Sequence, residues 1–227
     1  MIELKNIRHW VFDLDNTLYP NTTNLFSKID VLMCKFIEDN LRVSSEEALS
    51  IKDTYFHEHG TTLNGLMKNH KINAEEFLEF VHNIDYSLLQ KDLDLANEIK
   101  KLPGEKIIFT NGTKKHAQKV MKQLGIENNF EKIFDIIDAE FIPKPEIVPY
   151  KKMISIFEID TKNSIFIEDI AKNLLPAHEL GMKTAWVENE DLYCKAGFDG
   201  KHVHYKVKKL SDFLKQINES INKKHEI

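Results

Sequence analysis

The chain has 227 residues and a mass of 26.5 kDa, which suits one domain with a modest insertion and a sizeable core. Its 31 basic and 36 acidic side chains give a net charge of −5, far from the basic balance of proteins that bind nucleic-acid backbones. Two cysteines exclude a disulfide framework, the apolar runs are too short for a membrane span, and the first residues lack the pattern of a signal peptide. We therefore expect a cytoplasmic protein without a nucleic-acid or membrane partner. Composition says nothing about oligomeric state.

Short apolar strand patterns alternate with amphipathic helical patterns along most of the chain. In chain order, strands are predicted at residues 8–12, 106–109, 133–137, 164–167 and 184–187. Helical patterns over 115–124 and 173–180 stop at Gly125 and Gly181, which suit helix C-caps. A basic run at 206–209 indicates a solvated turn, and the tail from 211 begins as a helix and ends polar. The alternation predicts an α/β fold with a Rossmann-like, doubly wound parallel sheet.

The segment between the first two strand patterns has a different character. From about residue 20 to residue 90 strand patterns are absent, and apolar residues recur at helical spacing. Ser44 with Glu47, and Asn73 with Glu76, have the spacing of capping boxes and predict helix starts just after Ser44 and Asn73. We predict an all-helical domain at 20–90, inserted into an α/β core formed by 1–19 and 91–227.

Polar residues follow four of the predicted core elements. Open parallel sheets bind their ligands beyond the carboxyl ends of the strands, so these residues are the candidates for a site. Each group alone is typical of an ordinary turn or a solvated loop. Together and in this order they indicate a site for a divalent cation and a phosphate group. The groups are Asp13 and Asp15; Thr110, Asn111 and Gly112; Lys144 with Pro145; and Glu168 with Asp169.

These four groups resemble the four-motif signature of the haloacid dehalogenase superfamily of phosphohydrolases, over about residues 10–187. Residues 19–20, 55–67, 81–86 and 109–116 are in addition similar to the pyrimidine 5′-nucleotidase branch. The resemblance implies that the helical insertion is a cap domain, which closes over the site and helps to select substrates.

The resemblance, together with the chemistry of phosphate monoesters, gives the candidate residues their expected roles. Asp13 is the nucleophile that forms an aspartyl-phosphate, and Asp15 exchanges protons with the leaving group and with water. Mg²⁺ is the expected cofactor, and the resemblance implies that Asp13, Asp169 and the Asp15 carbonyl bind it, with Glu168 acting through water. Phosphate is held by the fixed charge of Lys144 and by the second group, Thr110, Asn111 and Gly112.

Several further residues allow two interpretations. Thr61 and Thr62 suit a helix end followed by a new N-cap as well as they suit recognition of a base. Asn173 suits either the start of a helix or a contact with substrate. Three histidines of the insertion, His57, His59 and His82, have a spacing that suits a zinc site poorly, so we expect them to be packing or surface residues. Two others, His116 and His178, lie in helical patterns that give them no chemical role.

The expected activity is Mg²⁺-dependent hydrolysis of pyrimidine nucleoside 5′-monophosphates such as UMP and CMP. The first alternative keeps the chemistry and changes the substrate to a sugar phosphate, phosphoglycolate or another small phosphomonoester. A second alternative is a phosphate-binding regulatory protein on an inherited fold. Asp15 argues against a dehalogenase, because that reaction needs no acid to protonate an alkoxide leaving group.

Overall fold

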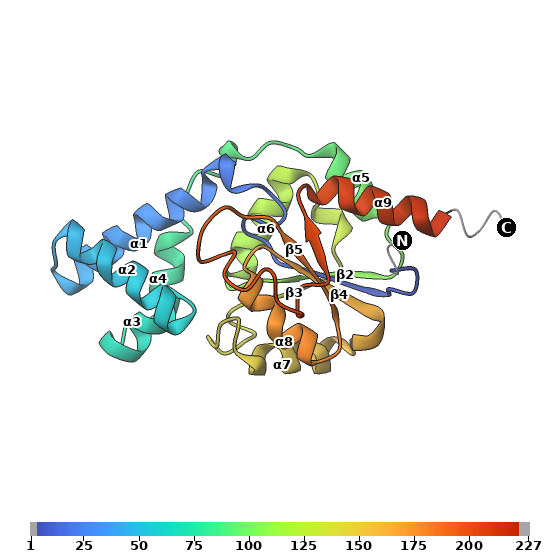
Figure 1. The fold of residues 1–227 in the computed structure, drawn as a ribbon. Coiled ribbons are helices and arrows are strands. Elements are labelled where there is room, and N and C mark those ends of the chain that lie inside the picture. Colours follow the sequence, from blue (N-terminus) through green and yellow to red (C-terminus); the bar gives the residue numbers. More distant parts are fainter. Residues whose placement is uncertain (1–3, 223–227) are drawn as a thin grey trace.

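A computed structural model describes residues 4–222 and centres on a six-stranded sheet (Figure 1). The strand order is β3-β2-β1-β4-β5-β6, and every neighbouring pair is parallel. The chain enters at the central strand β1 and continues on either side of it, so the loops after β1, β2 and β4 meet at one edge. The strands are β1 His9–Phe12, β2 Glu105–Phe109, β3 Lys132–Phe134, β4 Ser164–Glu168, β5 Lys183–Val187 and β6 Tyr205–Val207.

Helices cover both faces of the sheet. Within β1, Trp10 and Phe12 pack into a core with α5, α6 and α9, whereas Val11 packs on the opposite face with α7 and α8. Figure 1 shows these two layers above and below the strands. The predicted doubly wound sheet is therefore confirmed. The covering helices are α5 Leu93–Lys101, α6 Lys114–Leu124, α7 Ile147–Phe157, α8 Leu174–Glu179 and α9 Leu210–Asn222.

The segment between β1 and α5 is helical, as predicted, and lies to one side of the sheet (Figure 1). Its helices bury a cluster of their own, in which the rings of Phe36 and Phe77 meet edge to face at 5.1 Å. The Ser44 hydroxyl accepts a hydrogen bond from the Glu47 N–H at 3.2 Å, and Asn73 caps the last helix in the same manner. The helices are α1 Leu25–Leu41, α2 Ser45–His59, α3 Thr62–His70 and α4 Ala74–Val81.

Short 3₁₀ turns connect several of these elements. They are η1 Asn21–Thr23, η2 Tyr86–Leu88, η3 Glu127–Asn129, η4 Thr161–Asn163 and η5 Ala171–Asn173. The prediction for the first residues falls in part on 1–3, and that for the polar tail on 223–227, which lie outside the described residues.

Two predictions about the strands are wrong. The third strand ends at Phe134 instead of residue 137, because the Asp135 carboxylate accepts the N–H groups of Ile137 and Asp138, at 3.0 and 2.8 Å, and turns the chain. The predicted solvated turn at 206–209 overlaps the strand Tyr205–Val207, which pairs in parallel with β5 and buries Val207. This edge strand is short, and its central Lys206 faces solvent, so its sequence has little strand character.

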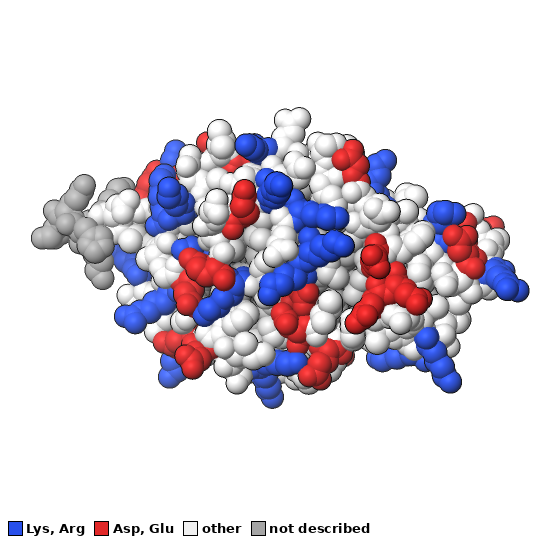
Figure 2. All heavy atoms as spheres, turned by 180° about the vertical axis from the view of Figure 1, so that it is seen from behind, with Lys and Arg blue, Asp and Glu red and all other residues white. Residues whose placement is uncertain are grey.

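The surface carries both signs of charge. Figure 2 shows basic and acidic side chains interspersed over one face of the molecule. Within residues 4–222, every helix falls short of the length and apolar character that a bilayer crossing requires.

Candidate active site

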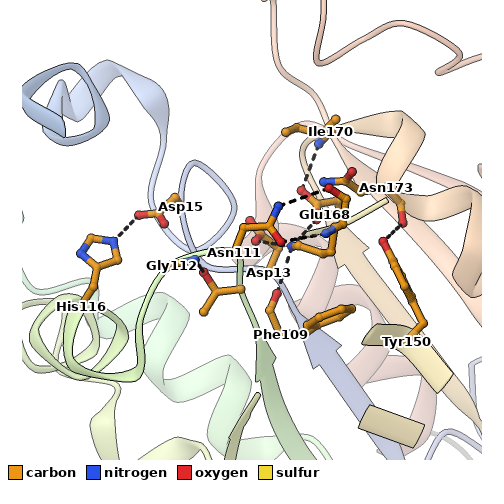
Figure 3. Close-up of polar contacts among 12 residues, drawn as sticks. Asp13, Asp15, Phe109, Asn111, Gly112, His116, Tyr150, Glu168, Ile170 and Asn173 are labelled. Carbon is orange, nitrogen blue, oxygen red and sulfur yellow. Dashed lines mark hydrogen bonds and ion pairs between the residues drawn. The ribbon is translucent and has the colours of Figure 1, made fainter. Parts of the chain in front are cut away.

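Four of the predicted site residues meet in one buried cluster at the edge where the central strands end. Figure 3 shows two of them, Asp13 and Glu168, close together. Asp13 follows β1, and its backbone N–H donates to the Ile167 carbonyl at 2.9 Å, which fixes the loop beside β4. Glu168 is the last residue of β4, and Asp169 comes directly after it. Lys144 reaches this cluster from the loop before α7.

Lys144 is the centre of the cluster. Its side chain is 1% exposed, and its ammonium donates to Asp13 Oδ1 and to Glu168 Oε2, both at 2.6 Å, and to the Phe109 carbonyl at 3.0 Å. Burial alone would lower the pKa of Lys144, but the charges of Asp13 and Glu168 raise it above its ordinary value. Lys144 is therefore not a solvated residue of an ordinary turn. Lys144 supplies a fixed positive charge beside Asp13.

The loop after β2 supports this lysine. The Asn111 side chain accepts from the Lys144 backbone N–H at 2.9 Å, so it fixes the backbone from which the lysine extends. The Gly112 N–H donates to the Thr110 hydroxyl at 2.9 Å. A Cβ at Gly112 would lie 3.1 Å from the ring of His116 and 3.3 Å from the Thr110 hydroxyl, so a larger residue there would require these side chains to move. Contacts of Thr110, Asn111 and Gly112 with phosphate stay predictions.

Three carboxylates converge beside Lys144. Oxygens of Asp13, Glu168 and Asp169 lie within 4.8 Å of one another. Burial, and then the charge of Glu168, raise the pKa of Asp13 to about 7 and hold that of Asp169 well above its ordinary value. One ammonium does not balance three buried carboxylates, and a divalent cation would. An all-oxygen donor set suits Mg²⁺, so these residues fit the expected metal.

The cluster leaves specific oxygens for such a cation. Both oxygens of Glu168 are in use, one by Lys144 and the other by the Ile170 N–H at 3.2 Å. Asp169 uses Oδ2 to accept from the Asn189 side chain at 2.7 Å, and its backbone carbonyl accepts from the Trp186 indole at 2.6 Å. This arrangement suits direct ligation by Asp169 better than by Glu168, in line with the expected roles.

Asp15 lies apart from this cluster and faces α6 (Figure 3). Its Oδ1 accepts from the Tyr19 hydroxyl at 2.5 Å and from His116 Nε2 at 2.8 Å. Burial alone would raise the pKa of Asp15, but the charge and hydrogen bond of His116 and the bond from Tyr19 bring it below its ordinary value. His116, for which the helical pattern gave no role, is buried against Asp15, and that expectation is corrected.

Three residues that bond to the site carboxylates were not among the predicted site residues. Tyr19 belongs to the segment that resembles the nucleotidase branch, but nothing in the pattern pairs it with Asp15. Asn189 follows β5 by two residues, and only the fold places it against Asp169. His116 did carry a signal, because it shares the apolar face of its helix with Val120 and Leu124 and so must point inward.

A cavity of about 540 Å³ lies between these loops and the inserted helices. Thr61, Thr62 and Asn173 all line it. The Thr61 hydroxyl accepts from the Asn64 N–H at 3.1 Å, as an N-cap does, and the Thr62 hydroxyl donates to the Lys52 carbonyl of α2 at 3.0 Å. The Asn173 side chain makes no capping bond to α8. Recognition of substrate by these three residues stays a prediction.

The insertion also touches the loop that carries Lys144. Gly60 ends α2 with φ at +80°, and a Cβ there would lie 3.1 Å from the Lys144 carbonyl. The three histidines of the insertion pack against aromatic rings, as expected: His57 on Tyr193 at 4.9 Å, His59 on Tyr55 at 5.7 Å, and His82 on His116 at 4.3 Å.

Comparison with known proteins agrees with this site. The family model of the haloacid dehalogenase-like hydrolases matches residues 10–187, which span all four polar groups, so the chain belongs to that family. It is 31% identical over 193 residues to phosphate metabolism protein 8 of Saccharomyces cerevisiae, and this alignment covers 75% of this chain and 58% of that protein. It is 26% identical over 111 residues to glyceraldehyde 3-phosphate phosphatase of Pyrococcus abyssi, over 48% of this chain and 46% of that protein. The chain thus spans about half the length of these relatives.

Solved structures share the fold at low identity. A HAD phosphatase from Thermococcus onnurineus superposes with a TM-score of 0.63 at 18% identity, covering 93% of this chain and 98% of that chain. L-2-haloacid dehalogenase from Xanthobacter autotrophicus superposes with a TM-score of 0.58 at 15% identity, covering 93% of this chain and 98% of that chain. The magnesium-bound HAD-hydrolase YfnB from Bacillus subtilis superposes with a TM-score of 0.60 at 16% identity, covering 95% of this chain and 99% of that chain. Because phosphatases and dehalogenases share this fold, the reaction has to be argued from the site.

Proposed function

We propose that this chain is a Mg²⁺-dependent phosphomonoesterase, with residues 20–90 as a cap domain over a core of 1–19 and 91–227. The observation that carries the proposal is the buried ammonium of Lys144, 2.6 Å from both Asp13 and Glu168 and beside Asp169. Asp15 adds a second carboxylate two residues beyond Asp13, at a different wall of the same cavity. A nucleophile, a proton carrier, a fixed cation and a cation-binding cluster are thereby assembled around one space.

The reaction would run in two displacements. Asp15 has to carry a proton when the first begins, although its pKa lies below the ordinary value. In that step a carboxylate oxygen of Asp13 bonds to phosphorus, the ester P–O bond breaks, and Asp15 gives its proton to the departing alkoxide oxygen. In the second, water attacks phosphorus and gives a proton to Asp15, the P–O bond to Asp13 breaks, and inorganic phosphate leaves. Each turnover thus consumes one ester and one water, releases an alcohol and phosphate, and restores both aspartates.

Lys144 offsets the repulsion between the Asp13 carboxylate and an anionic phosphate throughout both steps. Asp13, Asp169 and the Asp15 carbonyl would hold Mg²⁺, which supplies further neutralisation of the phosphate charge when bound. The Thr110 hydroxyl, which already accepts from the Gly112 N–H, keeps its own proton to donate to a phosphate oxygen.

Asp15 favours phosphate ester hydrolysis over dehalogenation. A halide leaves as a stable anion, whereas the alkoxide of a phosphate ester needs a proton, and here two donors hold a carboxylate at the required place. Two relatives carry phosphate in their names, as phosphate metabolism protein 8 and glyceraldehyde 3-phosphate phosphatase. A phosphatase reaction is the reading of the site that agrees with both.

For the substrate we propose pyrimidine nucleoside 5′-monophosphates. The cavity of about 540 Å³ has the size of small-molecule sites, and its cap side combines apolar walls with polar groups at Lys52 and Asp53. Sugar phosphates and phosphoglycolate are the competing substrates, because the core chemistry is the same for all. A cytoplasmic location stays a prediction from composition.

A substrate panel tests the proposal. We expect Mg²⁺-dependent phosphate release from UMP, CMP and dTMP to exceed that from AMP, GMP, glucose 6-phosphate and phosphoglycolate in kcat/KM. The reason is that the cap has to enclose the whole leaving group, and a purine adds a second ring. Phosphate release is followed with Mg²⁺ and with a chelator. Turnover concentrated on other esters would remove the nucleotide proposal and keep the phosphatase; no turnover at all would favour the regulatory protein.

Metal binding has a readout that needs no substrate. A ligand at about one hundred times its Kd stabilises a folded protein by about 2.7 kcal/mol, which for a chain of this size raises Tm by roughly 5–10 °C. We expect Mg²⁺ to raise the Tm of the wild type by this amount and to leave the Tm of the Asp169→Asn variant unchanged. Without Mg²⁺, the Asp169→Asn protein should melt no lower than the wild type, because one of three crowded buried charges is gone.

Asp53→Asn is the matched control, since Asp53 lines the same cavity but pairs with Lys52 outside the carboxylate cluster. It should retain the full Mg²⁺ shift. An equal shift for Asp169→Asn and the wild type would place the cation elsewhere.

A further inference from the structure

The two oxygens of Asp15 have unequal surroundings. Both donors, Tyr19 and His116, meet Oδ1, whereas Oδ2 accepts no hydrogen bond from any residue between 4 and 222. We assign the proton of the 2.8 Å contact to His116 Nε2, because Oδ1 can accept it whether Asp15 is ionised or carries a proton on Oδ2. Two donors on one oxygen fix the plane of the carboxyl group and leave Oδ2 as the oxygen available for proton exchange.

His116 is itself held from behind. It comes from the first turn of α6, where Thr113 caps the helix by accepting its N–H at 3.2 Å. Its other ring nitrogen, Nδ1, lies 3.0 Å from the Tyr86 hydroxyl oxygen, and the same oxygen lies 3.1 Å from the His82 carbonyl. The ring of His82 stacks on the imidazole at 4.3 Å with an angle of 12°. The imidazole is thus clamped by residues that follow and end α4, where the inserted helices return to the core.

We infer that His116 is a positioning residue, which through its Nε2–H holds Asp15 so that Oδ2 faces the leaving-group oxygen of a phosphate ester. The inference rests on the proposed phosphatase function. Tyr19 shares the task on the same oxygen, and Tyr86 fixes the imidazole. His116 is 1% exposed and does not line the cavity, so its effect on the reaction has to pass through Asp15.

A positioning role predicts that the effect depends on the leaving group. An alkyl phosphate releases an alkoxide, which needs the proton of Asp15, whereas 4-nitrophenyl phosphate releases a stable phenolate, which leaves without it. The second displacement is the same for both substrates and also uses Asp15, so the comparison is made in kcat/KM, which reports the steps through the first displacement. A loose Asp15 should therefore lower kcat/KM for alkyl phosphates and spare that for the aryl phosphate. Loss of folding or of active protein would slow both substrates equally.

Asparagine and glutamine at position 116 form a matched pair. The amide nitrogen of glutamine reaches the place of Nε2, and that of asparagine the place of Nδ1, so only His116→Gln keeps a donor toward Asp15. The probes are 4-nitrophenyl phosphate and whichever alkyl phosphate of the nucleotide and sugar panel the wild type hydrolyses fastest. His178→Asn serves as the control, because His178 lies on α8 and contacts the ring of His204 instead.

We expect His116→Asn to lower kcat/KM for the alkyl phosphate by about 10- to 100-fold and for the aryl phosphate by less than about threefold, from the usual size of general acid catalysis and of misplacement. His116→Gln should recover most of the loss, and His178→Asn should match the wild type. In an Asp15→Ala background, His116→Asn should cost nothing further on either substrate, since its effect requires the carboxylate.

Equal losses on both substrates, or the same loss with and without Asp15, would overturn the inference while leaving the phosphatase proposal intact. A wild type that hydrolyses no phosphate ester with Mg²⁺ would overturn both. If His116→Asn does not fold, Tyr86→Phe replaces it, because it keeps the ring and removes only the hydroxyl beside Nδ1. An unchanged ratio of alkyl to aryl rates in that variant would equally contradict the inference.

Discussion

Replacing Asp13 by asparagine is expected to lower kcat by about 10⁴-fold or more, the scale seen when a nucleophile is removed from an enzyme. The amide is nearly the same shape as the carboxylate, and its oxygen can still accept from Lys144, whose ammonium now lies 2.6 Å from Oδ1. What disappears is the nucleophilic oxygen. Phosphate release from the best substrate of the panel measures the effect.

The fold should survive this change. Asp13 has a pKa of about 7 because it is buried beside Glu168, so the neutral side chain relieves repulsion rather than breaking a needed pair. We expect an unchanged or higher Tm for Asp13→Asn, with mass spectrometry to exclude deamidation back to aspartate. Retained turnover in protein shown to carry asparagine would contradict the assignment of the nucleophile.

Lys144→Met is expected to damage both stability and activity. The side chain is 1% exposed and its ammonium is bonded to two carboxylates, which would be left buried without their cation. Breaking a buried ion pair in this way costs about 3–5 kcal/mol of folding free energy. Turnover should fall below detection, because repulsion between Asp13 and phosphate is no longer offset. Urea unfolding and phosphate release measure the two effects.

A second change separates charge from packing in this prediction. Adding Glu168→Gln to Lys144→Met removes one of the stranded charges and should recover part of the lost stability, but none of the activity. The surface pair of Lys152 and Glu140, at 2.7 Å, gives the control: Lys152→Met removes an ion pair of similar length and should change stability little. Equal destabilisation by the two lysine variants would show that burial of Lys144 has no such consequence.

Most of the fold follows from local sequence pattern. The first strand ends abruptly in Asp13, and the helix before Gly125 stops where a residue with φ at +73° is needed, so both boundaries have a local cause. The edge strand at Tyr205–Val207 has none, because its identity depends on pairing with β5 across 20 residues of chain, with Ala185 opposite Tyr205. Asp135 ended β3 early through side-chain hydrogen bonds that apolar periodicity does not register.

The candidate site likewise contains residues that local pattern predicts and residues that only the fold brings together. Asp13, Lys144 and Asp169 could be predicted because they lie beside strand ends or in a motif of fixed order. The partner of Asp15 could not be predicted, since His116 lies 101 residues away, in the first turn of an amphipathic helix. Only its place on the apolar face of α6 showed that a polar ring had to be buried there. Buried polar groups need partners, so the burial of His116 predicts a polar contact without identifying Asp15 as the partner.

The central claim is that Asp13 carries the phosphoryl group during turnover, and chemical trapping tests it most directly. Quenching the enzyme during turnover with Mg²⁺ and reducing it with borohydride converts an aspartyl-phosphate to homoserine, which peptide mass spectrometry locates. Asp15 lies on the same tryptic peptide, residues 9–28, and so serves as an internal control. The proposed mechanism predicts homoserine at position 13, unmodified Asp15, and no reduction in Asp13→Asn or in the presence of chelator. Homoserine at another position, or none during continuing turnover, would contradict it.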